Sequence, residues 1–158
     1  TVIGTAGGAE KCALAMANGY DHVIDYKSDD FEAEVIRLTD GVGVDVAYDS
    51  VGNDTMARSI TATKRHGTII AFGQSSGPYL DFKITDLAKG SYYLSRPTLF
   101  HFVADRAWLE NASAKLFQVV SDGTVSISIN QRFPLEDVAK AHEALAGRST
   151  TGCTILTP

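Results

Sequence analysis

Small residues stand directly after two apolar runs of this chain, where parallel strands would end. The run Val46–Asp49 leads into Ser50, Val51 and Gly52, and the run Ile69–Phe72 leads into Gly73, Gln74 and Ser75. A helix pattern lies between the two runs. In parallel α/β sheets, ligands bind beyond the carboxyl ends of the strands, where small residues let the backbone approach a nucleotide. The loops that follow these two runs, which we call the paired loops, therefore predict a dinucleotide site.

Alternating strand and helix patterns would position these loops. Short apolar runs predict strands at residues 1–5, 22–26, 45–50 and 68–72, and amphipathic patterns predict helices at 9–18, 29–39, 53–66 and 84–89. Asp29 and Glu32 have the spacing of a capping box, and Gly67 stands where the third helix would stop. This alternation predicts an α/β fold built on a doubly wound parallel, Rossmann-like sheet.

The pattern changes after residue 90. The apolar run 91–102 predicts an edge strand, because Pro97 interrupts it, and residues 105–121 predict an amphipathic helix. The alternation at 125–130 predicts a half-exposed strand, which a helix at 135–146 and a strand at 152–156 follow. We therefore expect a partial dinucleotide-binding domain at 1–124 and, at 125–158, a strand–helix–strand return to a second domain.

Composition excludes several classes of protein. The chain has 158 residues, of which 44% are hydrophobic and 21% charged, which suits one ordinary domain with a core. A net charge of −5 without a basic run argues against nucleic-acid binding, and no apolar stretch is long enough to span a membrane. Cys12 and Cys153 predict two free buried thiols in a reducing, cytoplasmic compartment, and no Cys/His spacing suggests a metal site.

An ordered set of short segments resembles one protein family. The segments are Ile3-Gly4-Thr5 with Lys11, then 23–26, 46–52, 72–77, 95–99, Pro134-Leu135, Ala141-His142 and 152–158. Together they resemble the cofactor-binding half of the NADPH-dependent quinone oxidoreductases, the zinc-free branch of the medium-chain dehydrogenase/reductase superfamily. The resemblance covers nearly the whole chain. It implies NADP(H) as the cofactor and a quinone or a related enone as the small-molecule substrate.

The resemblance also implies a preceding catalytic domain and a first strand and helix that carry phosphate-binding glycines. Neither is in this chain; in register, Gly4, Gly7 and Gly8 fall at the end of the second strand instead. In the strand order 3-2-1-4-5-6 the first strand is central, so the strands at 1–5 and 45–50 would each keep an unpaired edge. We expect the chain to be a piece of a longer one, and to bind no cofactor alone.

The resemblance assigns the adenosine end of the cofactor to the start of the chain. NAD-selective folds end their second strand with an acid that bonds the ribose 2′-hydroxyl. Residues 4–7, including Gly4 and Thr5, contain no acid, which permits NADP. The resemblance places Lys11, Tyr26 and Arg148 around the 2′-phosphate. Taken without the resemblance, Lys11 and Arg148 are more typical of ordinary solvated charges and Tyr26 of a rim aromatic, and Glu10 beside Lys11 must point outward.

The nicotinamide end is assigned by the resemblance to the paired loops. It places Ser50, Val51 and Gly52 along the ribose and nicotinamide, and Phe72, Gly73, Gln74 and Ser75 beneath the cofactor. Thr98, Leu99 and Phe100 would present backbone groups to the carboxamide. We assign Asp49 to loop capping rather than catalysis. The edge at Ser91–Phe102 is where this family pairs strands across a homodimer, and alternate residues can serve both roles.

No nucleophile or acid–base pair stands out, and we assign no catalytic residue. This agrees with nicotinamide chemistry, in which the cofactor transfers the hydride and the protein positions it. Two other functions remain open. One is a zinc-free enoyl or alkenal reductase, which a substrate panel would separate. The other is a non-catalytic NADPH-binding or interaction module, which cofactor binding without oxidation by any acceptor would favour.

Overall fold

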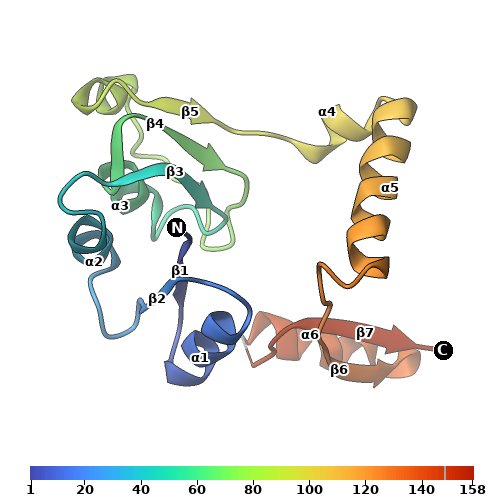
Figure 1. Cartoon of the computed structure of the whole chain (residues 1–158). Coiled ribbons are helices and arrows are strands. Elements are labelled where there is room, and N and C mark those ends of the chain that lie inside the picture. Colours follow the sequence, from blue (N-terminus) through green and yellow to red (C-terminus); the bar gives the residue numbers. More distant parts are fainter. Residues whose placement is uncertain (148) are drawn as a thin grey trace. The chain divides into compact units, whose positions relative to one another are not determined.

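The computed structural model describes residues 1–147 and 149–158, which form two compact units, Thr1–Leu99 and Phe100–Pro158. The first unit alternates strands and helices (Figure 1). Its elements are β1 (Ile3–Ala6), α1 (Ala9–Ala17), β2 (His22–Asp25), α2 (Phe31–Leu38), β3 (Val44–Asp49), α3 (Met56–Thr61), β4 (Thr63–Ala71), the 3₁₀ helix η1 (Ile84–Lys89) and β5 (Tyr93–Ser95).

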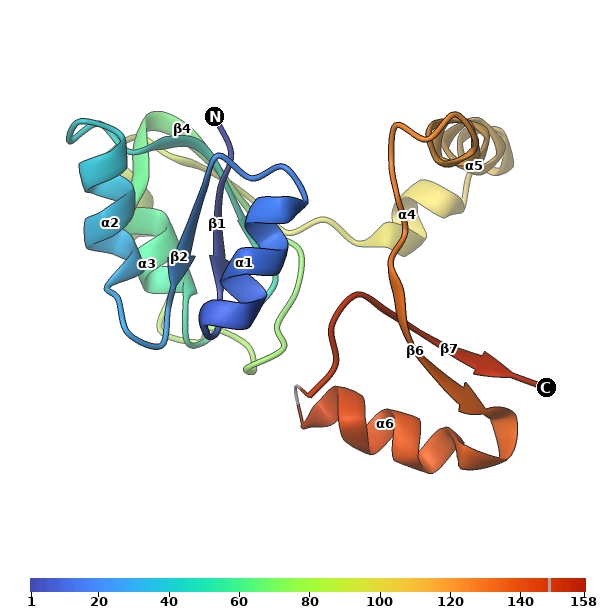
Figure 2. The same cartoon turned by 60° about the horizontal axis from the view of Figure 1, so that its bottom comes forward.

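Every strand pair of the first unit is parallel. β1 pairs with β2, and β3, β4 and β5 form a second sheet in that order. Helix α1 lies on one side of the strands, and α2 and α3 lie on the other (Figure 2). The predicted α/β fold with helices on both sides of parallel strands is confirmed.

β1 and β3 do not pair with each other, so each has a strand on one side only. This confirms the unpaired edges expected at these two strands. The two sheets are nevertheless joined by a hydrophobic cluster on one face. Its buried members are Ile24, Phe31, Val35 and Ala62, and the partly buried Ile3, Leu38 and Val44 pack against it. Burial of this apolar surface holds β1–β2 and β3–β4 in one unit without a hydrogen-bonded ladder between them.

A second cluster fixes the carboxyl ends of β3 and β4. Ile69 is fully buried between α3 and the segment that leads to β5. Met56, Ile60 and Ala71 complete the buried set, and Tyr79, Phe82, Tyr92 and Leu94 pack on it. The loops after β3 and β4 are therefore anchored to a packed core.

The capping residue of α2 differs from the prediction by one position. Asp30, not Asp29, accepts the backbone N–H groups of Glu32 and Ala33. The guanidinium of Arg58 on α3 also bonds Asp30 and lies 4.1 Å from the centroid of the Phe31 ring. Asp30 thus joins the amino end of α2 to α3. The sequence spacing alone did not distinguish a cap at Asp30 from a cap at Asp29.

The third helix is shorter than predicted. It ends at Thr61, and Gly67 lies inside β4 rather than after a helix. Thr63 already pairs with Val44, and the register then shifts so that Val46 pairs with Thr68. Strand pairing across the chain overrides the local helical pattern of residues 62–66. The additional strand residues form an irregularity at the amino end of β4, away from the loops.

The run at 91–102 is mostly not a strand, and that prediction was wrong. Only Tyr93–Ser95 pairs with β4, and α4 covers Leu99–Val103. Pro97 has no backbone N–H to donate to a ladder, so the strand ends before it. After the proline the chain turns into a helix instead of resuming the edge.

The second unit contains α5 (Arg106–Ser121), β6 (Ile129–Pro134), the 3₁₀ turn η2 (Leu135–Asp137), α6 (Val138–Ala146) and β7 (Cys153–Thr157). β6 and β7 pair in parallel across α6, which confirms the predicted strand–helix–strand order. The first strand begins four residues later than predicted, since Ile129 is the first residue paired with β7, and Val125 and Ile127 are exposed. The division at residue 124, which refers to a second domain, stays a prediction.

Exposure corrects two further expectations. None of the α5 residues is buried, although its apolar residues have amphipathic spacing. Both cysteines are free, but Cys153 is exposed and Cys12 half-buried, so the expectation of two buried thiols is wrong. Within the described ranges, no helix is both long and apolar enough to cross a membrane.

Candidate functional site

The loops after β3 and β4 lie side by side and are joined by backbone hydrogen bonds. The N–H of Ser75 donates to the Ser50 carbonyl at 3.2 Å, and the N–H of Ser76 donates to the Val51 carbonyl at 2.8 Å. The Ser76 hydroxyl also donates to the Val51 carbonyl, at 2.8 Å. The paired loops comprise residues 50–52 and 73–77. The adjacent strand ends predicted from the sequence form one continuous surface.

Two glycines allow this close approach. A Cβ atom on Gly73 would collide with the carbonyl oxygen of Ser50, and one on Gly52 would collide with that of Gly77. Gly52 also has a φ of 89°, in the left-handed region that favours glycine. Both positions therefore require glycine for the backbones to pack together.

Asp49 holds the first loop from behind. The side chain is 3% exposed. One carboxylate oxygen accepts the N–H groups of Val51 and Gly52, both at 2.9 Å. The other accepts the hydroxyls of Thr55 and Ser59 at 2.8 and 2.7 Å. This geometry supports the loop-capping role expected from the sequence, because the oxygens are already engaged by four donors.

The outer face of the paired loops carries the remaining predicted residues. Ser50, Gln74 and Ser75 are exposed, Val51 and Gly73 are half-buried and Gly52 is buried. Phe72, at the carboxyl end of β4, is 51% exposed. This face therefore offers hydroxyl, amide and aromatic groups around a close-packed backbone.

A second group of predicted residues lies at the carboxyl ends of β1 and β2. A Cβ on Gly7, just after β1, would lie 2.6 Å from the Tyr26 hydroxyl. Gly4 was expected here too, but it is the second residue of β1 and packs on the ring of Tyr20, which precedes β2. Thr5 is exposed on β1. Lys11 is in the first turn of α1, directly after this loop. The structure thus gathers Tyr26 and the loop that leads to Lys11, as the sequence predicts.

Asp25 is a member of this region that the sequence reasoning missed. One oxygen of its carboxylate accepts the N–H groups of Gly8 and Lys27 at 2.9 and 3.0 Å. The two hydrogen bonds hold the pKa of Asp25 below its usual range. Because Asp25 ends β2, which pairs in parallel with β1, its position at a strand end was a usable signal. An anion at this loop would have to bind side chains rather than the Gly8 amide.

Cys12 does not supply a nucleophile here. Burial, and then the carboxylates of Asp25 and Asp29, raise the pKa of the Cys12 thiol. A thiol is reactive as its thiolate, so these surroundings disfavour nucleophilic chemistry. Among the described residues, no group of three or more His, Cys, Asp or Glu side chains could hold a metal ion.

Four predicted residues are not placed at either group. Thr98 is exposed before α4, and Leu99 is 66% exposed in the first turn of that helix. Phe100, 78% exposed, belongs to the second unit. The expected extended backbone at 98–100 is therefore wrong from Leu99 onward. Arg148 lies outside the described residues.

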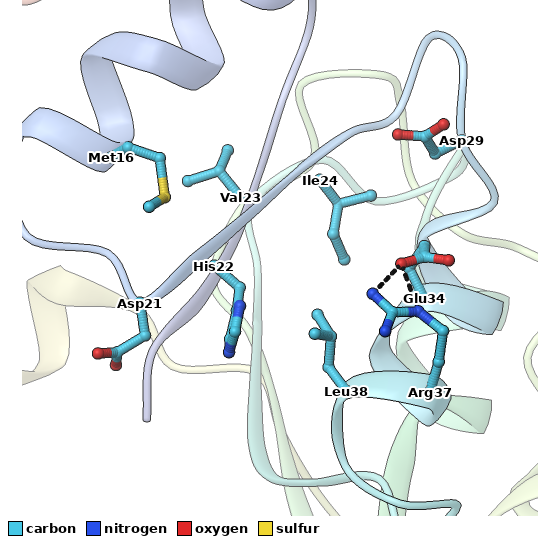
Figure 3. Close-up of a pocket in the computed structure, with 9 residues that line it drawn as sticks. All are labelled: Met16, Asp21, His22, Val23, Ile24, Asp29, Glu34, Arg37 and Leu38. Atoms are coloured by element: carbon cyan, nitrogen blue, oxygen red, sulfur yellow. Dashed lines mark hydrogen bonds and ion pairs between the residues drawn. The ribbon is translucent and has the colours of Figure 1, made fainter.

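An open pocket lies elsewhere, along β2 between α1 and α2 (Figure 3). Its volume is about 280 Å³, and one wall is the Arg37–Glu34 ion pair, at 2.8 Å. Met16 and Val23 lie toward α1, whereas Ile24 and Leu38 lie toward α2. None of the predicted site residues lines this pocket, and the paired loops remain the better candidate.

Comparisons with known proteins find a matching family model and related enzymes. Residues 18–156 match the family model described as zinc-binding dehydrogenase. A quinone oxidoreductase of Pseudomonas aeruginosa is 40% identical over 158 residues, covering 99% of this chain and 49% of that protein. A 2-haloacrylate reductase of Burkholderia is 39% identical over 161 residues, covering 100% of this chain and 48% of that protein. The chain spans about half the length of the curated relatives it matches.

A solved structure shares the fold at high similarity. The crystal structure of an Escherichia coli quinone oxidoreductase complexed with NADPH superposes with a TM-score of 0.94 and 37% identity. The match covers 99% of this chain and 49% of the crystallised one. The fold described above is therefore that of about half of such an enzyme.

Proposed function

The chain belongs to the zinc-binding dehydrogenase family, and from this premise we propose that it is the cofactor-binding part of an NADPH-dependent oxidoreductase. The whole protein would reduce quinones or related conjugated carbonyls. The observation that carries the proposal is the pair of loops at the carboxyl ends of β3 and β4, which glycine packing and backbone hydrogen bonds join into one surface. Parallel α/β sheets bind dinucleotides at this kind of place.

The chain's own residues fit two ends of NADPH. The paired loops would lie along the nicotinamide and its ribose, with Ser50, Gln74 and Ser75 exposed to donate hydrogen bonds. Gly4 and Thr5 would lie at the adenosine ribose. Lys11 and Tyr26 would bind the 2′-phosphate, with Arg148 as a third partner. When bound, the nicotinamide supplies the hydride, and the protein positions it and excludes water.

Three finer assignments accompany the proposal. We assign a homodimer to the edge at Ser91–Phe102, because its strand Tyr93–Ser95 has β4 as its single neighbour within the part of the chain that the structure describes. We assign a cytoplasmic location from the two free cysteines. We also assign a reaction that runs without zinc, as the resemblance implies. Sedimentation and metal analysis of the full-length protein test the dimer and the zinc content.

An enoyl or haloacrylate-type reductase is the alternative, since one relative is named a 2-haloacrylate reductase. Both reactions need the same cofactor-binding half, so the paired loops do not distinguish quinone reduction from haloacrylate reduction. Activity of the full-length protein on a panel of quinones, enones and 2-haloacrylates distinguishes the two reactions. Failure to oxidise bound NADPH with any acceptor would favour a non-catalytic binding module.

The deciding experiment is a titration with NADPH and NADH of this chain and of a version extended upstream. NADPH-selective binding that needs the extension supports the proposal, because helix-N-terminal phosphate contacts would lie in the added part. Binding by neither version overturns it. Binding by the chain alone would mean that the described loops suffice and that the expectation of an incomplete site is wrong.

A further inference from the structure

The backbone N–H groups of residues 51–55, from the first paired loop to the start of α3, are all engaged within the protein. The N–H groups of Val51 and Gly52 donate to Asp49. The N–H of Asn53 donates to the Gly77 carbonyl, and that of Asp54 donates to the Ser76 hydroxyl. The N–H of Thr55 donates to the Gly52 carbonyl. Five consecutive N–H groups, 51–55, are therefore closed to a ligand.

This arrangement is the opposite of a phosphate-binding loop. Phosphate loops direct free backbone N–H groups at the anion, at the start of a helix. Here the segment that leads into α3 engages the same groups within the protein, and the first two donate to a buried carboxylate. The carboxylate also places a negative charge directly behind the loop, which disfavours an anion on its outer face.

Asp49 is the residue on which this arrangement depends. It accepts the first two of the five N–H groups, and through Thr55 and Ser59 it also fixes the loop to α3. The carbonyl oxygens of Ser50 and Val51 are then oriented toward Ser75 and Ser76, which aligns the second loop. Losing the carboxylate would free two donors and loosen both loops together.

We propose that Asp49 is a positioning residue that makes residues 51–55 a surface without free backbone donors, selective for the uncharged nicotinamide end of NADPH over its phosphates. The inference rests on the proposed function. It deepens that function by giving a physical reason why the nicotinamide end, rather than a phosphate, lies at this loop. Asp49 acts through the loop and does not touch the cofactor.

The test is Asp49→Asn in the chain extended upstream, with Asp30→Asn as the matched control. Asp30 also caps a helix and accepts a guanidinium hydrogen bond, but it lies outside the paired loops. Two probes are titrated: NADPH, and adenosine 2′,5′-bisphosphate, which has the 2′-phosphate and no nicotinamide. Asp49→Asn should weaken NADPH about tenfold and leave the bisphosphate within about twofold, whereas Asp30→Asn should change neither beyond about twofold.

Amide hydrogen exchange without ligand gives the second readout. In Asp49→Asn the amides of Val51, Gly52, Ser75 and Ser76 should exchange at least about tenfold faster, while those of β2 keep their rates. A uniform acceleration throughout the unit would indicate lost stability alone and would overturn the positioning role. If Asp49→Asn does not fold, Ser59→Ala removes one hydroxyl donor and should produce the same pattern at smaller size.

The outcomes separate the inference from the proposed function. If the wild-type extended chain binds neither probe, the proposed function fails, and with it the ligand assigned to this loop. If the wild type binds both probes and Asp49→Asn weakens them equally or not at all, only the role of Asp49 is overturned. Loosened loops with unchanged NADPH affinity would overturn it as well.

Discussion

The α-carbon of Gly73 lies so close to Ser50 that a side chain at this position would strike the Ser50 carbonyl oxygen. The same carbonyl accepts a hydrogen bond from the Ser75 N–H, at 3.2 Å. One peptide group of the β3 loop therefore contacts the β4 loop both by packing and by hydrogen bonding. The candidate site depends on this contact, since it fixes the separation of the two loops.

Gly73→Val should lower both stability and cofactor affinity. The added side chain must displace the Ser50 peptide, and overpacking of this kind costs about 1–3 kcal/mol. Chemical denaturation of the chain measures the first effect, and NADPH titration of the extended protein measures the second. Ser75→Ala adds no atoms in the same loop and should change the free energy of unfolding by less than about 0.5 kcal/mol. Unchanged NADPH affinity in Gly73→Val would mean that β4 does not underlie the cofactor.

Lys11→Ala should weaken NADPH far more than NADH. Only NADPH carries the 2′-phosphate, and a hydrogen bond to a charged group contributes about 1.5–3 kcal/mol, so the loss is about tenfold or more. Fluorescence titration of the extended protein with both cofactors measures it. Lys89→Ala, which removes a surface lysine paired with Asp86, is the control and should leave both affinities unchanged. Equal losses for NADPH and NADH would contradict the 2′-phosphate assignment.

Features that repeat along the chain could be predicted from the sequence. The alternation of apolar runs and helix patterns predicted the parallel sheets, and the small residues after them predicted the paired loops. The unpaired edges of β1 and β3 also followed, from strand order alone. These inferences succeed because each depends on local pattern or on a general rule of parallel sheets.

Features that depend on distant partners could not be predicted. Thr63 is in a strand because Val44 pairs with it, and β6 starts at Ile129 because Cys153 lies opposite. Asp25 reaches the Gly8 amide across 17 positions of sequence. In each case the local residues allow another structure, and a contact from elsewhere in the chain selects between them.

Removing the contact between α2 and α3 should destabilise the first unit modestly. Arg58→Met keeps most of the side-chain length but loses the cation over the Phe31 ring, an interaction of about 0.5–1 kcal/mol at exposed sites. The ion pair with Asp30 adds little, since both side chains are exposed to solvent. Urea denaturation should therefore show a loss of about 1 kcal/mol or less. A larger loss would mean that the ion pair with Asp30 contributes more than its exposure to solvent suggests.

The Asp25 carboxylate should make stability fall in acid. Hydrogen bonds from Gly8 and Lys27 lower its pKa in the folded chain relative to the unfolded one. A lowered pKa stabilises the fold above the unfolded value, about 3.9, and this contribution is lost as the pH falls through the folded value. In Asp25→Asn no carboxylate titrates, so the free energy of unfolding should depend less steeply on pH between about 5 and 2. Denaturation series of both proteins across this range measure the slopes, and parallel slopes would show that the Gly8 contact does not form in solution.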